Sequence, residues 1–218
     1  MLARFLDPGF PSLKICGVRS ASDAEQLAEL GVDALGANFW PKSKRFLEPG
    51  QAGFLGELAG RILRVGVFVN APTDLPRRLF DAGLIDVAQL HGDEPESDIA
   101  LIKNHGIPVI RALGVRSPGD LETFVSLPSD AILLDAHAPG VYGGTGRTID
   151  WEAVGSFTAR HPKLSVVLAG GITPDNAAAA VATATPCAID VASGAESAPG
   201  VKDFAKVGAL LHACRRGG

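Results

Sequence analysis

The amino-acid sequence predicts an α/β fold, a closed (β/α)8 barrel formed by one domain over residues 1–218. Two observations lead to this prediction. Short apolar runs rich in β-branched residues recur at roughly even intervals, and segments with helical periodicity lie between them. Strands that alternate with helices in this way are parallel, because a parallel pair cannot be joined by a tight turn and needs a helical crossover.

The predicted strands are residues 13–16, 34–39, 63–69, 87–90, 109–113, 131–135, 165–169 and 188–191. A doubly wound open sheet is the alternative, and it would carry a G-x-G-x-x-G turn after its first strand. No such turn follows residue 16. Eight strand-helix repeats in about the length of a compact barrel therefore favour a closed TIM barrel.

Helical periodicity fills the intervals between the strands. It is clearest over residues 22–30, 74–82, 94–104, 118–127 and 174–182. Each of these segments begins with Pro, Ser, Thr, Asp or Glu, which are typical of helix N-termini.

Composition narrows the class of protein. Hydrophobic residues make up 46% of the chain, charged residues 20%, and the net charge is only -4 with no basic stripe, so we expect no nucleic-acid partner. No apolar run is long enough to span a membrane, and residues 1–11 do not form a signal peptide, so we expect a cytoplasmic protein. Cys16, Cys187 and Cys214 fit neither a disulfide framework nor a zinc site, so at least one thiol is expected to be free and no metal is expected.

In a (β/α)8 barrel the functional groups lie where strands end and loops begin. The first strand ends in Lys14-Ile15-Cys16-Gly17, and the sixth ends in Asp135 after four apolar residues. A lone buried cysteine more often packs as a small hydrophobe, and Asp135 could instead cap the loop that follows it. Their positions favour function, because desolvation raises a carboxyl pKa and lets Asp135 hold a proton as a general acid.

The loop after the second predicted strand holds three cations, Lys42, Lys44 and Arg45. Such a run is by default a solvated surface. At this rim, however, a cation would also lower the pKa of the thiol, and Arg45 could pair in a bidentate way with a substrate carboxylate. We therefore expect Arg45 to bind substrate.

Small residues follow the last two strands. Gly170 and Gly171 follow the seventh, and Asp190, Ser193 and Gly194 lie at the end of the eighth. Exposed backbone N–H groups at this place form the usual phosphate site of the barrel, so these residues are expected to bind a phosphorylated substrate.

Ordered motifs support a resemblance to a known family. They are Lys14-Ile15-Cys16-Gly17, Pro41-Lys42-Ser43-Lys44-Arg45, Val67-Phe68-Val69-Asn70, Gln89-Leu90-His91-Gly92, Leu133-Leu134-Asp135, Gly143-Gly144-Thr145-Gly146 and Gly170-Gly171-Ile172. From about residue 12 to the C-terminus, the chain resembles the phosphoribosylanthranilate isomerases of tryptophan biosynthesis. Val18-Arg19 and Asn38 depart from the family's pattern.

The resemblance implies a reaction and roles. The family performs an Amadori rearrangement of N-(5-phosphoribosyl)anthranilate to 1-(2-carboxyphenylamino)-1-deoxyribulose 5-phosphate, with no metal or organic cofactor. By resemblance, Asp135 protonates the ring oxygen and Cys16 takes the proton from C2.

A thiol acting as a base needs positive charge nearby, since its unperturbed pKa is about 8.5. Arg45 could supply this charge. Lys14 points to the same side of its strand as Cys16, and barrel closure places the eighth strand beside the first, so Lys14 is expected to pair with Asp190.

Other readings stay open at this point. The sister sugar isomerase of histidine biosynthesis carries an aspartate where Cys16 stands, and a non-catalytic phosphosugar-binding barrel need not keep Cys16, Asp135 and Arg45 together. His91 is as readily a structural histidine as a pocket residue. The loop that holds residues 143–146 is our candidate for a mobile segment, and both a monomer and a homodimer are compatible with the sequence.

Overall fold

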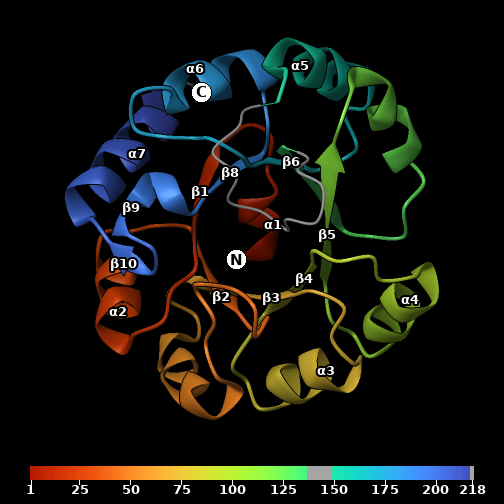
Figure 1. Ribbon diagram of the computed structural model, residues 1–218. Coiled ribbons are helices and arrows are strands. Elements are labelled where there is room, and N and C mark those ends of the chain that lie inside the picture. Colours follow the sequence, from red (N-terminus) through yellow and green to blue (C-terminus); the bar gives the residue numbers. More distant parts are fainter. Residues whose placement is uncertain (137–148, 217–218) are drawn as a thin grey trace.

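The structure, a computed structural model, describes residues 1–136 and 149–216. Its centre is a closed barrel of parallel strands in the order β1-β2-β3-β4-β5-β6-β7-β8, with β8 paired to β1. Figure 1 shows the helices as a ring around these strands. The predicted closed (β/α)8 barrel is confirmed. The segment 143–146, which we expected to be mobile, lies outside the described residues.

The barrel strands agree with their predicted ranges to within two residues at either end. They are β1 (Ser12–Cys16), β2 (Ala34–Asn38), β3 (Leu63–Phe68), β4 (Val87–Leu90), β5 (Val109–Val115), β6 (Ala131–Ala136), β7 (Val166–Leu168) and β8 (Ala188–Val191). A short antiparallel hairpin, β9 (Glu196–Ala198) and β10 (Val201–Lys202), follows β8 and was not predicted.

The helices are α1 (Leu2–Phe5), α2 (Ala21–Glu29), α3 (Asp74–Asp81), α4 (Glu96–Asn104), α5 (Trp151–Arg160), α6 (Ala177–Ala184) and α7 (Phe204–Arg216). In the described part of the chain, three 3-10 helices add to them: η1 (Pro49–Leu58), η2 (Pro118–Phe124) and η3 (Ser193–Ala195). The helix predicted at 118–127 forms as η2, which is shorter and of the 3-10 type. Side chains cap α2 and α5, where Ser20 accepts from Asp23 N and Asp150 accepts from Ala153 N.

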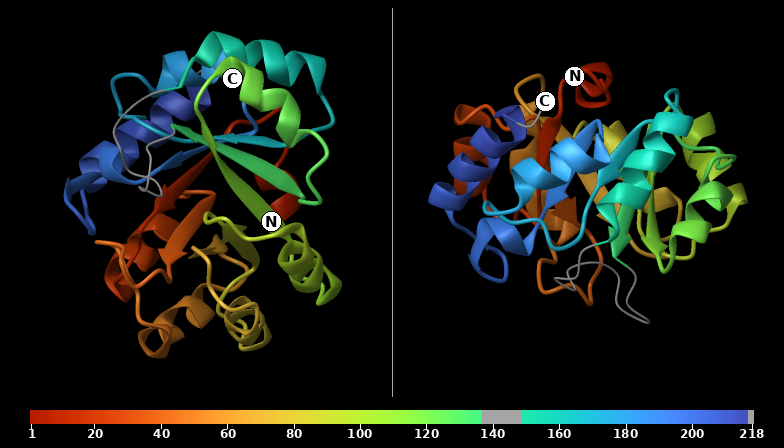
Figure 2. Two further views of the ribbon diagram at one scale, coloured as in Figure 1. Left: turned by 45° about the vertical axis from the view of Figure 1, so that its right-hand side comes forward. Right: turned by 90° about the horizontal axis from the view of Figure 1, so that it is seen from above.

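Two apolar layers hold the barrel together, because successive strand residues point to opposite faces of the sheet. The larger layer lies between the strands and the surrounding helices. The smaller layer fills the barrel itself and includes Leu63, Val65, Ile110 and Leu133. Phe5 of α1 is 1% exposed and packs onto this interior, and Figure 2 shows α1 at one end of the barrel. The C-terminal ends of the strands are at the other end.

Within the described residues, the helices are too short or too polar to cross a lipid bilayer.

Candidate active site

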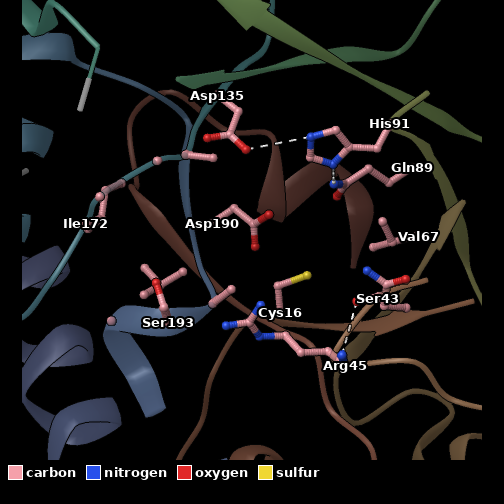
Figure 3. A pocket seen from close by; sticks show the side chains of 17 residues that line it. Cys16, Ser43, Arg45, Val67, Gln89, His91, Asp135, Ile172, Asp190 and Ser193 are labelled. Carbon is pink, nitrogen blue, oxygen red and sulfur yellow. Dashed lines mark hydrogen bonds and ion pairs between the residues drawn. The ribbon is translucent and has the colours of Figure 1, made fainter. Parts of the chain in front are cut away.

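A pocket opens at the C-terminal ends of the strands. Its lining includes every site residue that the sequence predicts: Cys16, Arg45, Asp135, Gly170, Gly171, Asp190, Ser193 and Gly194. Among the described residues, the lining also includes Asn38, Ser43, Val67, Gln89, His91, Ala169, Ile172, Val191 and Ala192. Figure 3 shows Cys16 and Asp135 on different sides of the pocket, with Asp190 between them. Because β8 lies between β1 and β7 in the barrel, one rim gathers residues that are far apart in the chain.

Asp135 is one of two buried carboxyl groups that line the pocket in the part of the chain that the structure describes, the other being Asp190. It is the inward-pointing residue two positions after Leu133 on β6 and is 6% exposed. Burial raises its pKa from 3.8 to about 6, and the negative charge of Asp190 acts in the same direction, while a hydrogen bond from Ala136 N at 2.8 Å opposes them. The group therefore exchanges a proton near neutral pH, which is the property required of a general acid.

Cys16 ends β1 with its sulfur in the pocket (Figure 3). It is 9% exposed and its thiol is free, as are those of Cys187 and Cys214. Those two lie elsewhere: each is buried and donates to a backbone carbonyl, that of Val166 and of Pro11 respectively. Cys16 is thus the cysteine that a ligand can reach.

Lys14 lies two residues before Cys16 and points into the barrel, where it is 0% exposed. Its Nζ donates to Asp190 Oδ1 at 2.9 Å, and the two residues are direct partners in the β1-β8 register. The expected Lys14–Asp190 pair is confirmed. Its ammonium is a buried charge close to Cys16.

Arg45 reaches the pocket but is already bound within the protein. Its Nε and Nη2 donate to the two carboxylate oxygens of Glu196 at 2.8 and 2.7 Å. The bidentate face that we expected to receive a substrate carboxylate is occupied by Glu196. The same pairing offsets the charge that Arg45 would exert on Cys16.

Sequence reasoning missed Glu196 and Lys202, which do not line the pocket but bind residues that do. Lys202 Nζ donates to Glu196 Oε1 at 2.8 Å and to the carbonyl oxygen of Cys16 at 2.5 Å. Burial opposes ionisation of Glu196, but hydrogen bonds from Arg45 and Lys202 hold its pKa below the ordinary value. The β9-β10 hairpin therefore ties Arg45 to the backbone of the thiol residue. Glu196 follows closely after β8, so the strand-end rule could have found it.

The two glycine-containing loops approach each other closely. Gly170 and Gly171 both have positive φ, at 86° and 63°, which is the left-handed region that favours glycine. A Cβ on Gly194 would overlap the carbonyl oxygen of Ile172, so the loop after β8 packs backbone to backbone against the loop after β7. Asn176 fixes the latter loop, since it accepts from Thr173 N at 2.8 Å and donates to Gly171 O at 2.9 Å.

His91 is a pocket residue, which settles a point that the sequence left open. Its Nε2 lies 3.6 Å from Asp135 Oδ2 and its Nδ1 lies 3.3 Å from Gln89 Nε2 (Figure 3). Burial lowers its pKa from 6.5 to about 4. The ring is therefore neutral at physiological pH and adds no charge to the site.

A buried ion pair orders the loop that carries His91. Arg111 pairs with Glu94, and its Nη2 donates to the carbonyl oxygen of Gly92 at 2.9 Å. Glu94 also accepts from the backbone N–H groups of Gly92 and Asn70. These bonds fix the position of His91 against Asp135. In the described part of the chain, no three His, Cys, Asp or Glu side chains are grouped as metal ligands would be.

The fold and the pocket place the chain among the (β/α)8-barrel enzymes, with groups suited to acid/base chemistry at the C-terminal ends of the strands. Comparison with known proteins narrows this class. Residues 13–213 match the family model described as N-(5'phosphoribosyl)anthranilate (PRA) isomerase. The chain belongs to this family.

Individual proteins of the same family are similar to the chain in sequence and in structure. The chain is 43% identical over 210 residues to N-(5'-phosphoribosyl)anthranilate isomerase of Myxococcus xanthus, covering 93% of this chain and 95% of that one. The crystal structure of phosphoribosyl anthranilate isomerase from Thermotoga maritima superposes with a TM-score of 0.85 at 34% identity, covering 94% and 98% of the two chains.

A further solved structure carries a ligand. It is a phosphoribosyl anthranilate isomerase in complex with reduced 1-(o-carboxyphenylamino)-1-deoxyribulose 5-phosphate, with a TM-score of 0.82 at 32% identity. That alignment covers 94% of this chain and 98% of the other.

Proposed function

We propose that the chain converts N-(5'-phosphoribosyl)anthranilate into 1-(2-carboxyphenylamino)-1-deoxyribulose 5-phosphate, an Amadori rearrangement in tryptophan biosynthesis. The observation that carries the proposal is one pocket that holds a buried carboxyl group with a raised pKa, Asp135, and a reachable thiol, Cys16. A rearrangement of this kind needs one proton donor and one proton acceptor and no change of redox state.

In the first step Asp135 acts as the general acid. It donates its proton to the furanose ring oxygen, the C1–O bond breaks, and the nitrogen lone pair forms the C1=N bond of a Schiff base. A carboxyl group with a pKa of about 6 is protonated in an appreciable fraction of molecules at neutral pH, whereas one at 3.8 would not be. Burial is therefore what suits Asp135 to this step.

In the second step Cys16 acts as the base. Its thiolate takes the proton from C2, the C–H electrons form a C1=C2 bond, and the C=N electron pair returns to nitrogen. The resulting enolamine gains a proton at C1 and loses one from the C2 hydroxyl to give the ketone. Asp135 and Cys16 lie on different sides of the pocket, so acid and base can act on different atoms of one sugar (Figure 3).

The remaining pocket residues fit the two ends of the substrate. Gly170, Gly171, Ser193 and Gly194 present the backbone of two neighbouring loops, which suits a phosphate group. Arg45 lines the pocket, and its guanidinium suits the anthranilate carboxylate. Three free cysteines support a reducing compartment, the cytoplasm, as the place of action.

The experiment is to follow anthranilate fluorescence when purified protein meets freshly generated phosphoribosylanthranilate. The wild type should consume the signal. Cys16→Ser and Asp135→Asn should each lose about 100-fold or more of the rate, the contribution of one acid or base group. A wild type that causes no decay beyond the spontaneous rate would overturn the proposal. An Asp135→Asn variant with unchanged rate would remove that residue from the mechanism.

A further inference from the structure

The interior of the barrel contains a fixed positive charge beneath the pocket. Lys14 is completely buried, and an isolated ammonium in such a place would be strongly unfavourable. Asp190 Oδ1, at 2.9 Å, compensates it. Although burial opposes the charged form, Asp190 raises the pKa of Lys14 above its ordinary value, so the ammonium persists throughout the physiological range.

Gly36 leaves the space in which this ammonium meets the thiol. It is the register partner of Cys16 on β2. A Cβ on Gly36 would lie 2.9 Å from Lys14 Nζ and 2.9 Å from Cys16 Sγ. Both atoms therefore converge on the place that a larger residue would fill, and they are less than about 6 Å apart, within the range at which a cation stabilises an anion.

Other charged groups also face Cys16 and must be weighed against Lys14. Lys202 contacts the carbonyl oxygen of Cys16, but it shares the carboxylate of Glu196 with Arg45. Burial is the largest influence and holds the pKa of Cys16 above its ordinary value; among the cations, Lys14 opposes this rise most, ahead of Lys202 and Arg45. The effect of Lys14 also exceeds the opposing effect of its partner Asp190.

Two further titratable groups, His91 and Asp135, face Cys16 from across the pocket. His91 is neutral because burial lowers its pKa to about 4. Asp135 exchanges its proton near pH 6, because burial raises its pKa to about that value. Neither contributes a positive charge that could replace Lys14.

We propose that Lys14 is a positioning residue for the thiol, because its ammonium stabilises the Cys16 thiolate. Asp190 holds the ammonium in place by an ion pair, and the absence of a side chain on Gly36 leaves room for it beside the thiol. The inference rests on the proposed function for the role of Cys16 as a base, but the electrostatic effect can be measured without substrate. The positive charge that lowers the pKa of the thiol is thus assigned to Lys14, whereas the sequence suggested Arg45.

The test is the rate at which iodoacetamide alkylates Cys16 between pH 6 and 11, followed by peptide mass spectrometry so that Cys187 and Cys214 are scored separately. In Lys14→Met the midpoint of the rate-pH curve should rise by about one pH unit or more, which corresponds to about tenfold slower alkylation at pH 7. Lys163→Met removes an exposed lysine far from the pocket and should leave the curve unchanged.

Lys14→Met leaves the Asp190 carboxylate buried without its partner, so this variant could fail to fold. A second variant therefore removes both charges of the pair. Lys14→Met/Asp190→Asn removes both charges, and its midpoint should still lie above that of the wild type, by less than in the single variant. Midpoints equal to the wild-type value in both folded variants would overturn the inference. Failure of the wild type to isomerise phosphoribosylanthranilate would overturn the proposed function instead, and the alkylation curve does not depend on it.

Discussion

Replacement of Asp135 by asparagine should make the protein less active and more stable. In the unfolded chain this carboxyl group has its ordinary pKa of 3.8, whereas burial in the fold raises its pKa to about 6. Below pH 3.8 the group is protonated in both states and its ionisation does not affect stability. Between pH 3.8 and 6 the unfolded chain ionises while the folded state still holds its proton, so stability falls over this range and levels off above it. The asparagine side chain avoids this penalty.

The magnitude follows from the two pKa values. At about 1.4 kcal/mol per pKa unit, the penalty approaches about 3 kcal/mol above pH 7 and is about half of that at pH 5. Asparagine Oδ1 can still accept the hydrogen bond from Ala136 N, so little else is lost. Asp135→Asn should therefore gain up to about 3 kcal/mol at pH 7.5 and about 1.5 kcal/mol at pH 5.

Urea unfolding at the two pH values measures this difference. Glu57→Gln, the same change at an exposed position, is the matched control and should shift stability by no more than about 0.5 kcal/mol. A variant that is less stable than the wild type at pH 7.5, or equally stabilised at both pH values, would refute the reasoning that burial sets the pKa of Asp135.

Three other substitutions or titrations test separate parts of the site. His91 should remain neutral down to about pH 5, because burial lowers its pKa to about 4, and imidazole ¹⁵N chemical shifts that titrate near pH 6.5 would contradict this. Gly194→Ala should raise KM about tenfold or more, because the methyl group overlaps the carbonyl oxygen of Ile172 and displaces the proposed phosphate loop; a wild-type KM would show that the loop does not bind substrate. Glu196→Gln should destabilise the protein by about 3 kcal/mol in urea unfolding, since it leaves Lys202 buried without a carboxylate, and an unchanged midpoint would mean that the pair contributes nothing.

Much of the fold could be predicted because each strand carries its own local signal. The runs at 87–90 and 188–191 coincide with β4 and β8, because a short, mostly apolar segment with β-branched residues has few alternatives to a buried parallel strand. The segment 118–127 was less well predicted. Its periodicity suits a helix, but Pro118 and Gly119 open it, and it forms the shorter 3-10 helix η2.

The site residues likewise differ in how well the sequence predicts them. Cys16 and Asp135 could be placed in the pocket from the sequence because the barrel gathers strand ends at one rim, a rule that needs only the strand assignments. The Lys14–Asp190 pair joins residues 176 positions apart, and it could be foreseen because closure makes β1 and β8 neighbours.

The contact between Arg45 and Glu196 could not be foreseen in the same way. It joins residues 151 positions apart through the hairpin β9-β10, whose two short strands carry too few residues for a recognisable pattern. A side chain that lies in a loop and acts by binding another side chain leaves no mark in local periodicity.

The central claim is that Cys16 takes the proton from C2 and Asp135 opens the ring. The most direct test is the kinetic isotope effect with phosphoribosylanthranilate deuterated at C2, measured for the wild type, Cys16→Ser and Asp135→Asn. Cys16→Ser slows proton abstraction, so it should show a larger isotope effect than the wild type. Asp135→Asn slows ring opening, which precedes the C–H cleavage, so its isotope effect should be suppressed. The opposite pattern, with the larger effect in Asp135→Asn, would contradict the assignment of the two roles.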